Sequence, residues 1–191
     1  ACGIDPGGAA WCWGSNGSGR LGDGTTTTRS SPAAVSGGLQ FAAISAGGAY
    51  TCAIATSGAG YCWGAGANGL LGNGTTSDQL SPALVTPTPG GVLLTSISAR
   101  SAHTCATTTV QTIVCWGVNT FGQLGDATNF TRLVATAVSG GLTWDQVQVG
   151  AEHSCGRATT GGIYCWGRND AGAVGDGTLF ARKQPVGAVR P

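Results

Sequence analysis

Four copies of the tripeptide Cys-Trp-Gly divide this chain of 191 residues, and their spacing limits what the chain can fold into. The four tryptophans follow one another after 50, 53 and 50 residues, at Trp13, Trp63, Trp116 and Trp166. Glycines six and nine residues further on keep the same register. Self-similarity with a period of this length is typical of tandem-repeat architectures. The sequence therefore predicts one repeat domain over residues 1–191, with repeats at approximately 1–31, 32–81, 82–134 and 135–184.

Each repeat contains short runs of β-branched and aromatic residues that glycine-containing turns separate. The runs in one repeat are SPAAV (31–35), FAAISA (41–46), TCAIAT (51–56) and GYCWG (60–64). No segment shows a helical period of adequate length. Because four short antiparallel strands per repeat of about 50 residues are typical of a propeller blade, we predict an all-β fold, a β-propeller of about four blades. The three extra residues near TPTPGG (86–91) are predicted to lengthen a turn.

The segment WGSNGSGRLGDGT (13–25), with its counterparts after Trp63, Trp116 and Trp166, resembles the regulator of chromosome condensation repeat. The resemblance covers essentially the whole chain. It implies a β-propeller, usually seven-bladed in that family, and a role in protein interaction. The chain departs from the motif at Gly66, where asparagine is expected, at Ala127, where glycine is expected, and at Val174, where leucine is expected.

The repeats predict nearly four blades rather than seven, which leaves three alternatives open. The chain is part of a longer propeller, which we favour, or it closes as a four-bladed ring, or two copies form an eight-bladed one. Residues 185–191 match SPAAV and could close the first blade. Blade edges without a neighbour favour self-association, because exposed strand edges pair with other chains.

Eight cysteines occur as four pairs, and the two partners of each pair are ten positions apart. In a hairpin that turns near Ser57-Gly58, Cys52 and Cys62 lie opposite each other, at a distance that suits a disulfide. The repeat extends this to four disulfides within blades: Cys2–Cys12, Cys52–Cys62, Cys105–Cys115 and Cys155–Cys165. Such cysteine usage favours an oxidising compartment, secreted or at the cell surface.

Composition excludes several classes of function. Charged residues make up 9% of the chain and the net charge is +1, so no basic surface for nucleic acid is expected. No apolar run is long enough to span a membrane. The glycine-rich turns lack the lysine and the following helix of a phosphate loop. His103 and His153 share one repeat position, which indicates a structural role, and no catalytic residue, metal site or cofactor is predicted.

The segments after GDGT differ between repeats, and variable loops on a rigid scaffold are where recognition is expected. Candidate binding residues are Phe130, Arg132, Phe180 and Arg182, with Trp11 and Trp144 outside the repeat pattern. We expect a non-enzymatic, extracellular or cell-surface module whose loops bind a protein or a glycan. The alternative is a structural subunit of an extracellular fibre, sheath or appendage that assembles through blade edges.

Overall fold

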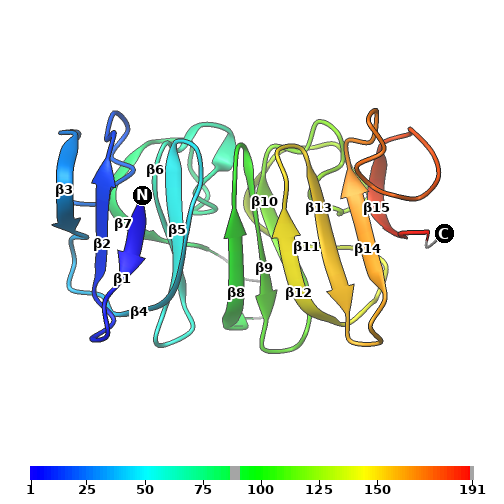
Figure 1. Cartoon of the computed structure of the whole chain (residues 1–191), viewed down its shortest axis with the longest axis horizontal. Helices are drawn as coiled ribbons and strands as arrows, with labels where there is room; N and C mark the ends of the chain where they lie inside the picture. The colour runs from blue at the N-terminus through cyan, green and yellow to red at the C-terminus, as the bar shows by residue number, and fades with distance from the viewer. Residues whose placement is uncertain (87–90, 190–191) are drawn as a thin grey trace.

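The computed structural model describes residues 1–86 and 91–189 and is built from four antiparallel sheets (Figure 1). The sheets stand side by side as an arc, with the two ends of the chain at opposite ends of the arc (Figure 1). This confirms the predicted all-β propeller architecture of four blades. Most of the predicted lengthened turn, residues 87–90, lies outside the described residues.

The first blade has three described strands and the other three blades have four each. The first blade contains β1 (Cys2–Ile4), β2 (Ala10–Gly14) and β3 (Arg29–Ala34). The second contains β4 (Phe41–Ala46), β5 (Tyr50–Ala55), β6 (Gly60–Gly64) and β7 (Gln79–Leu84), with a short 3-10 helix η1 (Ala67–Gly69) between β6 and β7. The third contains β8 (Leu94–Ala99), β9 (His103–Thr108), β10 (Ile113–Gly117) and β11 (Arg132–Ala137). The fourth contains β12 (Trp144–Val149), β13 (His153–Ala158), β14 (Ile163–Gly167) and β15 (Arg182–Gly187).

The central hairpin of every blade sets the cysteine register. In the second blade, β5 and β6 pair so that Cys52 lies opposite Cys62. The same pairing occurs in the other three blades, and all four predicted disulfides form, each with Cα atoms 4.1 Å apart. Each disulfide therefore crosslinks two adjacent strands of one blade and leaves the neighbouring blades unlinked.

The blades do not share the boundaries of the sequence repeats. The strand that contains Pro32, assigned from sequence to the repeat 32–81, is β3 and pairs with β2 of the first blade. The cause is the long glycine-rich turn after each Cys-Trp-Gly, which folds the chain back onto the strand it has just left. Residues 185–187, which from sequence could close the first blade, likewise lie in β15 and pair with β14 of their own blade.

The core lies inside the blades and at the junctions between them. Trp63, Trp116 and Trp166 are fully buried at 0% exposure, whereas Trp13 of the first blade is 36% exposed. Each buried indole packs on a glycine of the preceding blade: a Cβ on Gly125 would lie 2.7 Å from Trp166 Nε1. Because Gly125 also has a φ of +72°, a conformation that residues with a Cβ rarely adopt, the junction requires glycine there.

Candidate functional site

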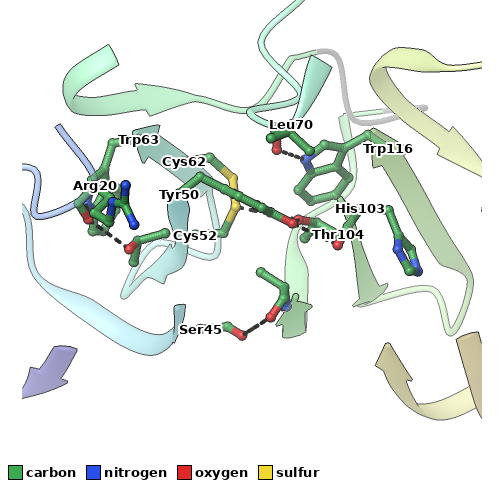
Figure 2. Close-up of a disulfide and its surroundings, with 12 residues drawn as sticks. Arg20, Ser45, Tyr50, Cys52, Cys62, Trp63, Leu70, His103, Thr104 and Trp116 are labelled. Atoms are coloured by element: carbon green, nitrogen blue, oxygen red, sulfur yellow. Dashed lines mark hydrogen bonds between the residues drawn. A yellow bond between two sulfur atoms is a disulfide. The ribbon is translucent and has the colours of Figure 1, made fainter. Parts of the chain in front are cut away.

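The blades are joined by a tryptophan hydrogen bond that recurs at each junction. Trp116 Nε1 in the third blade donates to the backbone carbonyl of Leu70 in the second, over 3.1 Å (Figure 2). Trp63 donates in the same way to Arg20 over 3.1 Å, and Trp166 to Gln123 over 2.9 Å. A buried carbonyl and a buried indole N–H thus satisfy each other, and the turn that carries the carbonyl is fixed.

A second set of contacts crosses the same junctions. The Tyr50 hydroxyl lies 2.9 Å from Thr104 Oγ1 of the next blade (Figure 2), and His103 Nε2 lies 2.8 Å from Ser154 Oγ of the blade after it. Burial, together with the nearby His153, lowers the pKa of His103 to about 4, so its imidazole is neutral at pH 7. Among the described residues, Nδ1 of His103 has no hydrogen-bond partner. These contacts give His103 a role in blade packing, as the repeat position indicated.

The loops between the third and fourth strands of a blade are held at their base by an aspartate. In the third blade, Asp126 accepts hydrogen bonds from Asn119 Nδ2 at 2.9 Å and from Arg132 Nε at 2.7 Å. Asp126 Oδ1 also accepts from the Thr128 amide and hydroxyl. Burial alone would raise the pKa of Asp126, but the hydrogen bonds from Thr128 and Arg132 outweigh it and the pKa is lowered. The carboxylate stays charged and holds the loop closed.

The same arrangement recurs in the first and fourth blades, where Arg29 and Arg182 pair with Asp23 and Asp176. The second blade lacks it, because Asn73 and Gln79 replace the aspartate and the arginine. Gly66 also replaces the asparagine there, and the Ser77 backbone lies where a side chain at Gly66 would stand. Arg132 and Arg182 were predicted from sequence as binding residues. In the structure, their guanidinium groups form ion pairs with Asp126 and Asp176 of their own loops.

Phe130 and Phe180 stand at the same position of the loops in the third and fourth blades and are 71% and 74% exposed. We call residues 126–131 and 176–181 the aromatic loops. Leu179, also exposed, adds apolar surface to the second of them. Since the base of each loop is fixed by the aspartate network, the aromatic rings are presented on ordered backbone, which lowers the entropy cost of binding.

The two remaining candidates differ from each other. Trp11 is exposed on the first blade and donates its indole N–H to Asp5 over 3.0 Å. Trp144 is 3% exposed and packs against Trp166, with ring centroids 5.9 Å apart, so it is a core residue and not part of a binding loop. The spacing in the sequence could have indicated this core position, because Trp144 stands 22 residues before Trp166 and the buried Phe41 stands 22 residues before Trp63.

Sequence reasoning missed the contacts between blades, such as Tyr50 with Thr104, because residues more than 50 positions apart meet there. Nothing in the local pattern distinguishes a hydroxyl that faces a neighbouring blade from one that faces solvent. Among residues 1–86 and 91–189, no three His, Cys, Asp or Glu side chains gather as a metal site would require. In the same part of the chain, no helix combines the length and apolar character needed to cross a membrane.

Radially arranged antiparallel sheets of three or four strands, joined by the same tryptophan hydrogen bond at each of the three junctions, define a tandem-repeat β-propeller. The sequence profiles of the Regulator of chromosome condensation (RCC1) repeat match residues 7–54, 57–107 and 144–173, which is more than half of the chain. The chain belongs to the RCC1 repeat family. A comparison of this sequence with curated proteins found no match.

Solved structures show the same fold. Human WBSCR16 superposes with a TM-score of 0.86 at 19% identity, covering 100% of this chain and 50% of its own. Prp20p from Saccharomyces cerevisiae gives a TM-score of 0.86 at 19% identity, with 99% of this chain and 48% of its own covered. The ectodomain of the Physcomitrella patens receptor kinase CR4 gives 0.55 at 23% identity, with 87% and 36% covered. This chain thus spans about half the length of the first two structures.

Proposed function

We propose that this RCC1-repeat chain is a secreted or cell-surface interaction module that binds its ligand through the aromatic loops. The observation that carries the proposal is the exposure of Phe130 and Phe180 on loops whose backbone is fixed by Asp126 and Asp176. Exposed aromatic side chains on ordered backbone are typical of residues that dominate binding energy. The four disulfides support an extracellular setting.

A protein ligand is favoured over a glycan. Phe130, Phe180 and Leu179 offer apolar surface without hydrogen-bonding groups, and the nearby arginines are engaged with aspartates. One solved structure of the same fold is of yeast RCC1 (Prp20) with the protein Kap60 bound to it. We propose binding rather than catalysis as the activity of the module. His103, one of its two histidines, is buried at a junction between blades and does not reach the surface.

The test compares the native protein with the variant Phe130→Ser/Phe180→Ser. Val110→Ser is the matched control, because Val110 is also an exposed apolar side chain but lies in the β9–β10 turn. Partners crosslinked to each protein on intact cells or in culture medium are identified by mass spectrometry, and a glycan array is run in parallel. We expect a protein partner that the control retains and the double variant loses.

The expected loss is at least tenfold in affinity, about 1.4 kcal/mol or more, with unchanged thermal stability since both rings are exposed. A partner that binds the double variant as well as the native protein contradicts the assignment of the aromatic loops. Binding to glycans alone, lost in the double variant, replaces the protein ligand with a glycan.

A further inference from the structure

Three segments of the chain match the acceptor pattern for N-linked glycosylation, in which serine or threonine follows an asparagine by two positions. They are Asn16-Gly17-Ser18, Asn73-Gly74-Thr75 and Asn129-Phe130-Thr131. The pattern alone does not distinguish the three. The folded protein can carry a glycan only where the asparagine side chain reaches solvent and where the fold does not need both hydrogens of its amide group.

Asn16 is an internal part of the first-blade loop. It is fully buried, and its Nδ2 donates to Asp23 Oδ1 over 3.1 Å and to the Thr25 carbonyl over 2.9 Å. Its Oδ1 accepts from the Leu21 amide over 2.9 Å. Both hydrogens of the amide group are used inside the loop, and a sugar on Nδ2 would replace one of them. The fold therefore excludes a glycan on Asn16.

Asn73 lies at the contact between the second and third blades. Its Oδ1 accepts from the Thr75 amide over 3.1 Å and from the Thr75 hydroxyl over 3.0 Å. Asn73 is half-buried and forms an isolated bridge with Val134 of β11, and the Gly74 amide donates to the Leu133 carbonyl over 2.9 Å. A glycan here would stand against the neighbouring blade, so we expect Asn73 to stay unmodified.

Asn129 is exposed on the aromatic loop of the third blade, and so is Thr131 two positions later. The Asn129 Nδ2 donates to the Thr120 carbonyl over 2.8 Å, which uses one of the two hydrogens of the amide group. Glycosylation replaces one hydrogen and leaves the other. The hydrogen bond to Thr120 is therefore compatible with a sugar on Nδ2.

The loop does not need an asparagine at position 129 for its shape. The other three loops have different residues at this repeat position, namely Thr26, Thr76 and Leu179. The asparagine that the third-blade loop does need is Asn119, which donates to Asp126, as its counterparts do in the first and fourth blades. Asn129 thus stands apart from the repeat pattern, on backbone that Asp126 holds in place.

We propose that Asn129 is the residue on which this chain carries an N-linked glycan. The proposal rests on the extracellular setting of the proposed function, because this modification belongs to exported chains. In the reaction, a transferase moves an oligosaccharide from a lipid-linked pyrophosphate donor to Asn129. The bond between sugar C1 and the pyrophosphate oxygen breaks, and a bond between C1 and Nδ2 forms. Nδ2 loses a proton, and the lipid pyrophosphate leaves.

A glycan on Asn129 makes the two aromatic loops different. The fourth-blade loop has Leu179-Phe180-Ala181 where the third-blade loop has Asn129-Phe130-Thr131, so only the third-blade loop has an acceptor. Phe130 then stands next to a large hydrophilic group, whereas the loop of Phe180 carries none.

The test uses the native protein from the organism that makes it. Trypsin separates the three acceptors, because arginines lie between them. The peptides that contain the three asparagines are, in order, 1–20, 30–100 and 101–132. After reduction, alkylation and digestion, a peptide:N-glycosidase releases the glycan and converts the asparagine that carried it to aspartate. Mass spectrometry should find this conversion in the peptide 101–132 alone.

Two variants test the acceptor pattern while the Asn129 side chain stays in place. Thr131→Ala removes the hydroxyl that the pattern requires, so the protein should lose the mass of the glycan. Thr131→Ser is the matched control, because it keeps the pattern and should keep the glycan. Thr131 is exposed, so both variants should fold with unchanged thermal stability.

A native protein without a glycan in the peptide 101–132, or with one in 1–20 or 30–100 instead, overturns the proposal. A glycan that remains in Thr131→Ala overturns it as well. Phe130→Ser/Phe180→Ser keeps the acceptor pattern and should keep the glycan. A glycan on Asn129 together with a partner that still binds this double variant contradicts the proposed function alone, and loss of the partner without any glycan contradicts this proposal alone.

Discussion

Trp116 of the third blade donates its indole N–H to the backbone carbonyl of Leu70 in the second blade, over 3.1 Å. Both residues are buried, and Gly72 beside Leu70 leaves room for the indole. Since the disulfides lie within blades, this side chain and its counterparts in the other blades are central to holding one blade on the next.

Trp116→Phe should destabilise the fold. Phenylalanine keeps an aromatic ring at the junction but leaves the Leu70 carbonyl without its donor, and the smaller ring leaves a cavity. We expect a loss of about 2–3 kcal/mol in the free energy of unfolding, measured by urea denaturation with the disulfides intact. Trp11→Phe, at an exposed indole of the first blade, should change it by less than about 1 kcal/mol. Equal effects of the two substitutions would contradict this role for Trp116.

Acid should weaken the junction between the third and fourth blades through His103. Burial lowers the pKa of His103 from 6.5 to about 4, so below pH 6.5 the unfolded chain binds a proton that the folded chain does not. The stability that this histidine contributes is complete above pH 6.5 and is lost as the pH falls towards 4, by about 3 kcal/mol.

The measurement is the free energy of unfolding between pH 7 and pH 4. His103→Tyr, which places at this position the residue that Tyr50 supplies in the second blade, should flatten the curve over this range. His153→Gln keeps the buried imidazole of His103 and should retain most of the loss. A native curve that is already flat contradicts the buried neutral state of His103.

Ala127→Gly should stabilise the third blade. Ala127 has a φ of +68°, in a position where Gly24, Gly74 and Gly177 have φ near +80° in the other blades. Removing the Cβ relieves left-handed strain worth about 1 kcal/mol. Gly177→Ala, the reverse change at the same loop position, should destabilise by a similar amount. Differential scanning calorimetry of the two variants measures both signs, and shifts in the same direction contradict the strain argument.

Asp126→Ala should loosen the aromatic loop of the third blade. Without the carboxylate, Asn119 and Arg132 lose their acceptor, and we expect a cost of about 1–3 kcal/mol. Hydrogen exchange of the amides in 126–131 should accelerate while the loop at 176–181 stays protected. Asp170→Ala, at an exposed carboxylate, is the control. Unchanged exchange at 126–131 would show that the loop is held by other contacts.

The fourth-blade loop should also respond to strong acid. Burial would raise the pKa of Asp176, but hydrogen bonds from Thr178 and Arg182 lower it to about 2. The carboxylate therefore stays ionised below the ordinary aspartate pKa of 3.8, and the stability that its contacts give the loop is lost as the pH falls from about 4 to about 2. Nuclear magnetic resonance titration of the Asp176 carboxyl carbon measures this pKa, and an ordinary value near 3.8 contradicts the network.

The hairpins and disulfides could be predicted from sequence because both depend on contacts close along the chain. Cys52 and Cys62 flank one turn, and the spacing of ten residues fixes their register. Strand pairing across a longer turn could not be predicted in the same way. The strand of Pro32 follows a loop of fourteen residues, and nothing local shows whether it pairs with the strand before it or with the strand after it.

The hydrogen-bond network at the base of the loops could have been predicted from a spacing that recurs in the sequence. An arginine follows an aspartate by six residues at Asp23–Arg29, Asp126–Arg132 and Asp176–Arg182, and Asn73 and Gln79 replace the pair in the second blade. Phe130 and Phe180, which lie between them, were singled out from sequence as binding residues; the structure shows both exposed, and their role in binding stays a prediction. The contacts between blades could not be predicted, because they depend on the angle at which one sheet meets the next.

Because each disulfide begins and ends inside one hairpin, every repeat carries its complete crosslink. A gene duplication or deletion that adds or removes a whole blade leaves no cysteine unpaired. During synthesis, each hairpin can also be oxidised as soon as its second strand emerges, before any later blade exists. The number of blades is thereby free to change in evolution without any rearrangement of the redox chemistry that the remaining blades depend on.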